Sequence, residues 1–159
     1  MSDVSITQAS CCKYELEIEM GASRQRVWTA LIDEINDWWL PDFHVVAADS
    51  TVTLNPDPGG PGLVERTVGG SALQWYAVQM YLPDQFKIYL VGHIAPEWGG
   101  PVTSNLQFAL TETSSGAEAS CLFKLVDARH GNVNQAHLNS YQDGWRMLFT
   151  DGLKKYVEA

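Results

Sequence analysis

The segment from residue 132 to residue 158 constrains the fold most, because its pattern predicts one long amphipathic helix. Apolar and aromatic side chains recur there at steps of three and four residues, which places them on one helical face. The members of this series are Val133, His137, Tyr141, Trp145, Leu148, Phe149, Leu153 and Tyr156. So large an aromatic face needs a broad apolar partner that covers it.

Two glycines lie inside this predicted helix. Gly144 and Gly152 each lower the stability of a helix by about 1 kcal/mol relative to Ala. We therefore expect each of them to mark a close approach of another segment or a bend.

Much of the remaining chain has the pattern of strands separated by turns. Residues 14–20, YELEIEM, alternate strictly between large apolar and acidic side chains, as in a strand with one solvent-exposed face. Further strand-like runs cover residues 63–68, 73–82, 86–92, 102–111 and 117–127. Turn residues separate these runs at spacings of about ten to fifteen residues, which favours an antiparallel meander over βαβ units.

Two short helices are predicted directly after the first strand. Ser23 can cap a helix over residues 24–31, and a second helix over residues 33–39 is stopped by Pro41. This order predicts an α+β fold, in which a curved antiparallel sheet of about six or seven strands surrounds the C-terminal helix. We expect a single domain over residues 13–159 and a flexible N-terminal tail over residues 1–12.

Charge and composition exclude several classes of partner. Ten Lys and Arg residues against nineteen Asp and Glu give a net charge of −9, which disfavours nucleic acid and anionic lipid surfaces. The N-terminus lacks the basic and apolar regions of a secretory signal, and no apolar run of about 18 residues could span a membrane. The three cysteines form no C-x-x-C motif. We therefore expect a cytoplasmic protein that binds neither nucleic acid nor membranes, and the sequence leaves a homodimer open.

The sequence predicts no metal site, no cofactor and no catalytic constellation. The four histidines lie far apart and show no HxH or HxxxH spacing. There is no G-x-S-x-G elbow, and the GGPG run at residues 59–62 is not followed by the G-K-[ST] of a phosphate-binding loop.

Four segments resemble a known family. They are VWTALIDEINDWW at 27–39, YLPDQFKIYLVG at 81–92, VTSNLQFALTETSSGAEASCLFKLV at 102–126 and GWRMLFTDGLKKYVE at 144–158. They are similar to the activator-of-heat-shock-protein-90-ATPase-like family, which belongs to the START/birch-pollen-allergen (SRPBCC) superfamily. The resemblance covers roughly residues 14–158 and implies a helix-grip fold with a deep, mostly apolar cavity between the sheet and the long helix. It also implies binding of lipids, sterols, polyketides or other aromatics, with catalysis in a minority of members.

Several aromatic and histidine residues are candidates for the wall of such a cavity. An inward Trp or Tyr offers an apolar surface with one polar group, and a His can bind a polar ligand group or act as an acid or base near neutral pH. The candidates are Trp39, Trp75, Tyr76, Tyr89, His93, Trp98, His137, Tyr141 and Trp145. The run LQWYAVQMYL at 73–82 is apolar or aromatic on both faces, so the sequence leaves open which face points inward.

Three functions follow as hypotheses. The first is an intracellular carrier or sensor that holds a small hydrophobic or aromatic molecule in the cavity. The second is an enzyme of the polyketide-cyclase or hydrolase kind, with His137 or His93 as acid or base and Tyr141 orienting the substrate. The third is a co-chaperone-like interaction protein that presents Trp98 on the Gly- and Pro-rich loop at residues 95–101.

Overall fold

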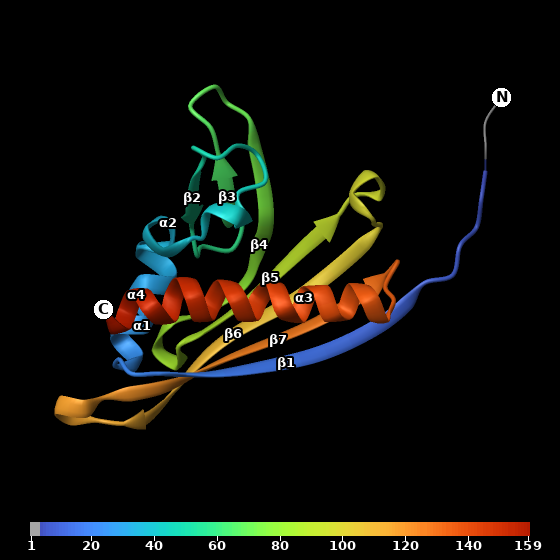
Figure 1. The fold of residues 1–159 in the computed structure, drawn as a ribbon. Coiled ribbons are helices and arrows are strands. Elements are labelled where there is room, and N and C mark those ends of the chain that lie inside the picture. The colour runs from blue at the N-terminus through green and yellow to red at the C-terminus, as the bar shows by residue number, and fades with distance from the viewer. Residues whose placement is uncertain (1–3) are drawn as a thin grey trace.

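A seven-stranded antiparallel sheet forms the framework of the protein in a computed structural model that describes residues 4–159. The strands are β1 (Ser10–Met20), β2 (Thr51–Leu54), β3 (Leu63–Arg66), β4 (Ala72–Leu82), β5 (Lys87–Ile94), β6 (Val102–Ser114) and β7 (Ser120–Gly131). Their order in the sheet is β1-β7-β6-β5-β4-β3-β2, so β2 to β7 form a meander and β1 pairs with the last strand. Figure 1 shows β2, β3 and the adjoining end of β4 rising away from the other strands.

One long helical rod covers the concave face of this sheet (Figure 1). It consists of α3 (Gln135–Met147), a π-helical segment (Leu148–Lys154) and α4 (Lys155–Glu158). The helices α1 (Arg24–Asp33) and α2 (Ile35–Trp38) follow β1 directly, and the Ser23 hydroxyl accepts a hydrogen bond from the Arg26 amide at 3.1 Å. The α+β architecture predicted from the sequence is confirmed. None of the helices within residues 4–159 is long and apolar enough to cross a membrane.

The two edge strands of the sheet, β1 and β2, differ from the strands predicted from the sequence. β1 begins at Ser10, so Cys11 and Cys12, which we expected in the tail, pair with His130 and Arg129 of β7. Residues 1–3 of the expected tail lie outside the described residues. β2 was not among the predicted strands, because its four residues are too few for a period-two pattern to stand out.

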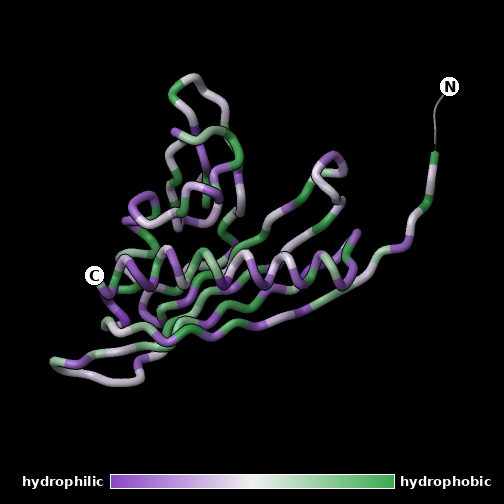
Figure 2. Tube along the Cα trace, in the orientation of Figure 1, coloured by the Kyte–Doolittle hydropathy of each residue, from purple (hydrophilic) through white to green (hydrophobic). Residues whose placement is uncertain are grey.

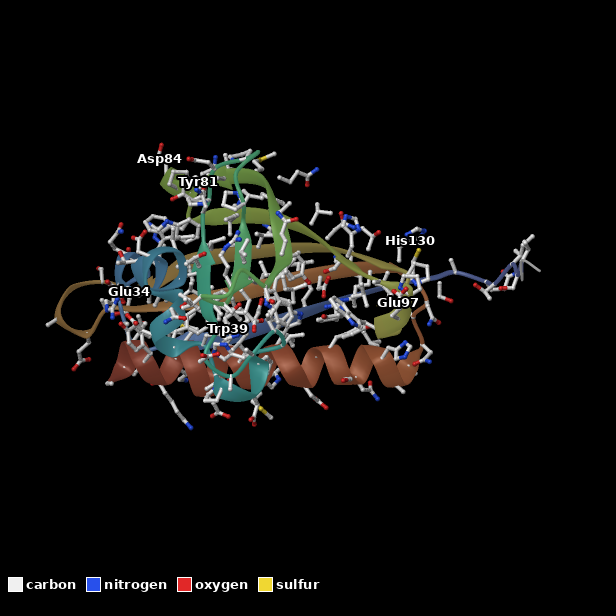
Figure 3. The ribbon with its side chains drawn as sticks, turned by 90° about the horizontal axis from the view of Figure 1, so that it is seen from above. Glu34, Trp39, Tyr81, Asp84, Glu97 and His130 are labelled. Atoms are coloured by element: carbon white, nitrogen blue, oxygen red, sulfur yellow. The ribbon has the colours of Figure 1, made fainter. Side chains whose placement is uncertain are left out.

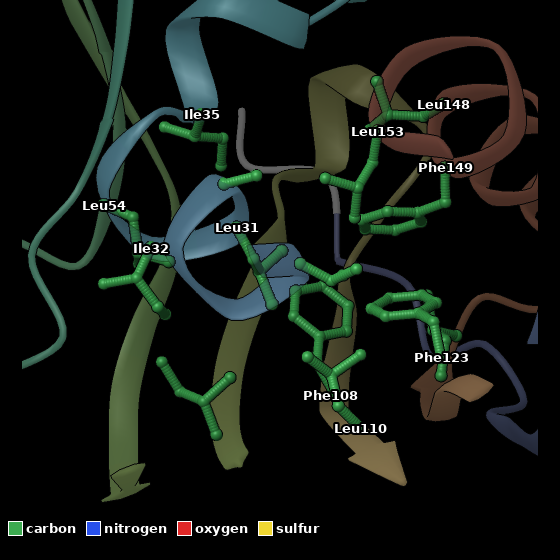
Figure 4. Close-up of a cluster of buried hydrophobic side chains, with 14 of the residues drawn as sticks. Leu31, Ile32, Ile35, Leu54, Phe108, Leu110, Phe123, Leu148, Phe149 and Leu153 are labelled. Carbon is green, nitrogen blue, oxygen red and sulfur yellow. The ribbon is translucent and has the colours of Figure 1, made fainter. Parts of the chain in front are cut away.

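The hydrophobic core lies between the sheet, the helices α1 and α2 and the π-helical segment (Figure 4). The rings of Phe123 and Phe149 have centroids 4.5 Å apart, and Phe108 packs edge-on against Phe149 at 5.2 Å. Hydrophilic and hydrophobic residues alternate along the strands (Figure 2), and the inward members of β6 and β7 are buried. These rings fill the space next to the π-helical segment, so the open space described below lies farther along the helix, beside α3.

Gly152 lies where the helical rod passes closest to α2. A Cβ atom on Gly152 would lie 2.6 Å from the carbonyl oxygen of Trp38, closer than folded chains allow. The expected close approach is therefore present at this glycine. Gly144 differs, because the nearest atom to a Cβ there is Phe43 Cε1 at 3.9 Å, an ordinary contact distance.

Candidate ligand-binding cavity

A cavity of about 340 Å³ lies between the sheet and α3. Its size is at the lower end of the range for small-molecule sites. The wall comes from α3, from the inner face of β4 to β7 and from the segments that follow α2 and β5. The lining residues are Trp39, Phe43, Val45, Leu73, Gln74, Trp75, Tyr76, Gly92, His93, Ile94, Trp98, Ser104, Arg129, Ser140, Tyr141, Gly144, Trp145 and Leu148. Figure 3 shows Trp39 close to the middle of the long helix.

Aromatic side chains form most of this wall. Trp39 packs edge-on against Trp75 with ring centroids 5.8 Å apart, and Tyr76 lies 6.1 Å from Trp145. Trp98 is 63% exposed although it borders the cavity, so its indole ring lies at the mouth rather than in the interior. Edge-on and tilted ring contacts of this kind hold a wall of fixed shape.

A β-bulge explains why the neighbouring residues Trp75 and Tyr76 both reach the cavity. In the pairing of β3 with β4, Leu63 lies opposite Tyr76 and Val64 opposite Gln74, so Trp75 is the extra residue. Gly92 on β5 leaves room for Tyr76, because a Cβ atom at Gly92 would lie 2.8 Å from the tyrosine ring. The sequence left open which face of β4 points inward. A bulge determines this, and a pattern of strict alternation cannot reveal a bulge.

Below the aromatic wall, a buried carboxylate organises the polar part of the cavity. Asp127 on β7 is 0% exposed and accepts three hydrogen bonds. The Ser104 hydroxyl donates to its Oδ1 at 2.7 Å, and the Tyr14 hydroxyl and Arg129 Nε donate to its Oδ2. Since Ser104 gives its one proton to Asp127, the hydroxyl of Tyr76, 2.8 Å from Ser104 Oγ, donates to Ser104.

Arg129 is the cationic partner of this carboxylate. Its Nε lies 2.7 Å from Asp127 Oδ2, and its Cζ lies 3.6 Å from the centre of the Tyr141 ring. The side chain is only 6% exposed. A guanidinium stacked on an aromatic ring and bonded to a carboxylate is held in one orientation.

Burial and charge shift the protonation equilibria of this cluster. Burial, followed by the negative charge of Asp127, raises the pKa of Tyr14 and of Tyr76 well above the usual value of tyrosine. Burial by itself lowers the pKa of Arg129, but its electrostatic interactions with Tyr76, Asp127 and Tyr14 and its hydrogen bond to Asp127 outweigh burial and raise the pKa. Both tyrosines are therefore neutral and Arg129 is charged at neutral pH. Within residues 4–159, no three His, Cys, Asp or Glu side chains are grouped so that they could hold a metal ion.

A second buried carboxylate, Glu65 on β3, fixes the segment at the cavity mouth. Its side chain accepts hydrogen bonds from the amides of Val45 and Val46 at 2.8 and 2.7 Å, from Ser50 Oγ at 2.6 Å and from Trp75 Nε1 at 3.1 Å. Burial alone would raise the pKa of Glu65, but these four donors outweigh it and lower the pKa. Glu65 thus ties two pieces of the wall, Val45 and Trp75, to the sheet.

The structure brings most of the candidate residues together at the cavity. Trp39, Trp75, Tyr76, His93, Trp98, Tyr141 and Trp145 border it, whereas Tyr89 and His137 are not among the lining residues. Tyr89 lies on the outer face of β5, where its hydroxyl accepts a bond from Gln107. His93 sits at the rim with its ring on the outer face, 3.4 Å from the Thr103 hydroxyl. Contact of these side chains with a ligand stays a prediction.

The polar residues of the site were not among those predicted from the sequence. Asp127 and Arg129 continue the inward series of β7 that begins with Cys121, Phe123 and Leu125, and Ser104 occupies an inward position on β6. The sequence did contain a signal for these three residues, because polar side chains occupy strand positions at which the alternation predicts apolar ones. Glu65 gave no such signal, because β3 is only four residues long.

No family model matches the chain, and no curated protein matches its sequence. Solved structures do share its fold. Norcoclaurine synthase from Thalictrum flavum in complex with dopamine and hydroxybenzaldehyde matches with a TM-score of 0.57 at 14% identity, covering 99% of this chain and 96% of that one. Ara h 8.0201 matches with a TM-score of 0.61 at 12% identity, covering 93% and 98%. Protein MLL2253 from Mesorhizobium loti matches with a TM-score of 0.62 at 16% identity, covering 92% and 97%.

The chain has the helix-grip fold. Its structural neighbours share this fold, which the resemblance of its sequence segments implied. At these identities the likeness concerns the fold alone. In the helix-grip fold of this chain, the cavity lies between the gripping sheet and α3.

Proposed function

We propose that this helix-grip protein binds a small hydrophobic or aromatic molecule in the cavity between the sheet and α3. The observation that carries the proposal is the aromatic lining, to which Trp39, Trp75, Trp98 and Trp145 contribute four of the six tryptophans of the chain. Removing apolar surface from water contributes about 25 cal/mol per Å². A flat apolar molecule in this cavity would be enclosed by rings on several sides.

The structural neighbours support this class of ligand. Norcoclaurine synthase was solved with dopamine and hydroxybenzaldehyde, which are both small aromatic molecules. A cavity of about 340 Å³ suits a ligand of similar class. We extend the ligand class to this chain, and not the reaction.

Catalysis has less support than binding. An efficient acid or base has a pKa near the working pH and touches the substrate. His137 lies outside the lining residues, and the ring of His93 lies on the outer face of the sheet. Tyr76 does border the cavity, but burial raises its pKa away from neutrality.

A second candidate is an interaction protein of the co-chaperone type, as the resemblance to the activator family implies. The observation that favours it is the 63% exposure of Trp98. However, Trp98 also borders the cavity, so a ligand would contact the same indole ring. Substitution Trp98→Ala distinguishes the two functions. The binding function predicts that the affinity for the small molecule falls, and the interaction function predicts that this affinity is unchanged.

Native mass spectrometry tests the proposed function. The protein is mixed with a panel of neutral aromatic and alkyl compounds, and each added mass is compared between the wild type and Gly144→Leu. Leucine at this position extends from α3 into the cavity and replaces a poor helix former with a good one. We expect complexes with the wild type and none with Gly144→Leu. Ala136→Leu, an exposed site on the same helix, is the matched control and retains binding.

Absence of any complex with the wild type, or equal binding by Gly144→Leu, would contradict the proposed function. A thermal unfolding curve for each variant establishes that loss of binding does not come from loss of the fold.

A further inference from the structure

We propose that the ligand of this cavity carries a carboxylate and that Arg129 is its anchor. The proposal rests on the binding function above and specifies the chemical class of the ligand: a small, mostly apolar or aromatic carboxylic acid. It follows from the charge, the orientation and the unused hydrogen-bond donors of one buried side chain.

Arg129 is the one Arg, Lys, Asp or Glu residue among those that line the cavity. The lining contains no Asp, Glu or Lys, and Asp127 stands behind Arg129 and not on the wall. The rest of the chain is acidic, with a net charge of −9. Although the Asp127 carboxylate offsets part of the charge of Arg129, the cavity wall itself presents cationic donors and no carboxylate, which favours an anionic group in a ligand.

The guanidinium of Arg129 has donors that no protein group uses. Its Nε donates to Asp127, but no acceptor in residues 4–159 takes a hydrogen bond from its two terminal nitrogens. The buried side-chain nitrogens without a partner in residues 4–159 are Arg24 Nε and His137 Nδ1. The terminal nitrogens of Arg129 are not among them, so they keep accessible surface, and the open space beside them is the cavity.

The neighbours of Arg129 leave one direction free. Asp127 occupies the Nε edge, and the Tyr141 ring covers one face of the guanidinium at 3.6 Å. The free edge carries the two terminal nitrogens, whose geometry matches the two oxygens of a carboxylate. A ligand that fills the cavity displaces water from these donors, so a ligand that supplies two acceptors to them binds more tightly than one that leaves them unpaired.

A matched pair of ligands tests this anchor. Isothermal titration compares 2-naphthylacetic acid with 2-naphthylacetamide at neutral pH, because the two compounds share one shape and differ in charge. The test variant is Asp127→Asn/Arg129→Gln, which removes the ion pair without leaving an unpaired charge. The control variant is Arg146→Gln, which removes an exposed arginine in the last turn of α3. Circular dichroism and thermal unfolding verify that each variant is folded.

We expect the wild type and Arg146→Gln to bind the acid at least about tenfold more tightly than the amide, as a charge-assisted bidentate contact predicts. The double variant should bind both compounds with affinities within about threefold of each other. If the double variant does not fold, Arg129→Lys replaces it, and the preference should fall because an ammonium group cannot form the paired bonds.

Three results overturn the inference. Equal affinity of the wild type for acid and amide removes the carboxylate from the proposal and leaves the binding function intact. A preference for the acid that persists without Arg129 removes Arg129 as the anchor. Failure of the wild type to bind either compound overturns the inference together with the binding function.

Discussion

Arg129 Nε and Asp127 Oδ2 lie 2.7 Å apart on one strand, two residues from each other and both within the protein interior. The preceding inward positions of β7 hold Cys121, Phe123 and Leu125, which belong to the core. The strand thus changes from apolar packing to a buried ion pair where the space beside α3 opens. Ser104 and Tyr14 also bond to Asp127, which offsets part of the cost of removing its charge from water.

Removing one member of this pair should be strongly destabilising. Arg129→Gln leaves the Asp127 charge buried, so we expect a loss of about 3–5 kcal/mol in the free energy of unfolding. Asp127→Asn/Arg129→Gln should lose less than the sum of the two single variants. Urea unfolding measures these values, and the exposed pair Glu15 and Lys124 is the matched control, whose coupling should be much smaller because solvent screens it. A coupling for the buried pair as small as for this surface pair would contradict the account.

Glu65 should make stability depend on acid pH. Its pKa is lower in the folded protein than in the unfolded chain, so its contribution is present above the unfolded value of about 4.3 and is lost as the pH falls through the folded pKa. Glu65→Gln should lose about 2–3 kcal/mol at pH 7, because an amide nitrogen then replaces one carboxylate oxygen and faces the donors that bonded to that oxygen. Unfolding of both proteins between pH 7 and about pH 3 measures the effect, which should shrink toward acid pH. Glu19→Gln, at an exposed position, should follow the wild type.

The buried tyrosines should make stability fall at alkaline pH. The pKa values of Tyr14 and Tyr76 are raised on folding, so their contribution is complete below the unfolded value of about 10 and is lost as the pH rises above it. Tyr76→Phe should therefore lose stability less steeply above pH 10 than the wild type. Tyrosinate absorbance recorded along with unfolding checks this. Tyr89→Phe, on the outer face of β5, is the control, and a curve for Tyr76→Phe that overlays the control would oppose the assignment.

Alanine at the two helix glycines should shift stability in opposite directions. Helix propensity alone predicts a gain of about 1 kcal/mol at each site. At Gly152 the new Cβ would lie 2.6 Å from the Trp38 carbonyl oxygen, so we expect a net loss of about 1–3 kcal/mol. Gly144→Ala meets only ordinary contacts and should gain up to about 1 kcal/mol. Thermal unfolding measures the stability of both variants. A higher Tm for Gly152→Ala than for the wild type would show that the π-helical segment and α2 are not in close contact.

Much of the fold could be predicted from the sequence, because it depends on periodicity. The series from His137 to Tyr156 determines the long helix, which begins at Gln135 and not at the predicted residue 132, so Val133 lies outside it. The alternation in residues 14–20 determines β1. The superfamily resemblance supplied the helix-grip fold and the cavity. The start of β1 and the existence of β2 were missed, since short or polar strand ends carry little periodic signal.

The site was predicted only in its aromatic part. Trp39, Tyr141 and Trp145 could be named as candidates because large rings stand out in a sequence. Tyr89 was named for the same reason, but the register of β5 places it on the outer face. Arg129 gained its position from hydrogen bonds with residues distant in sequence, above all Tyr14 and Ser104 through Asp127. Such a network depends on strand register, which no local pattern specifies.

Chemical-shift mapping with the neutral probe 2-naphthylacetamide tests the central claim most directly, because it reports both binding and its location. We expect shifts of the backbone amides of Tyr76, Gly92 and Trp145 around the cavity, and we expect these shifts to be lost in Gly144→Leu. Absence of shifts would contradict the account. So would shifts confined to the surface hollow lined by Trp28, Tyr81 and Phe86, on the other side of the core.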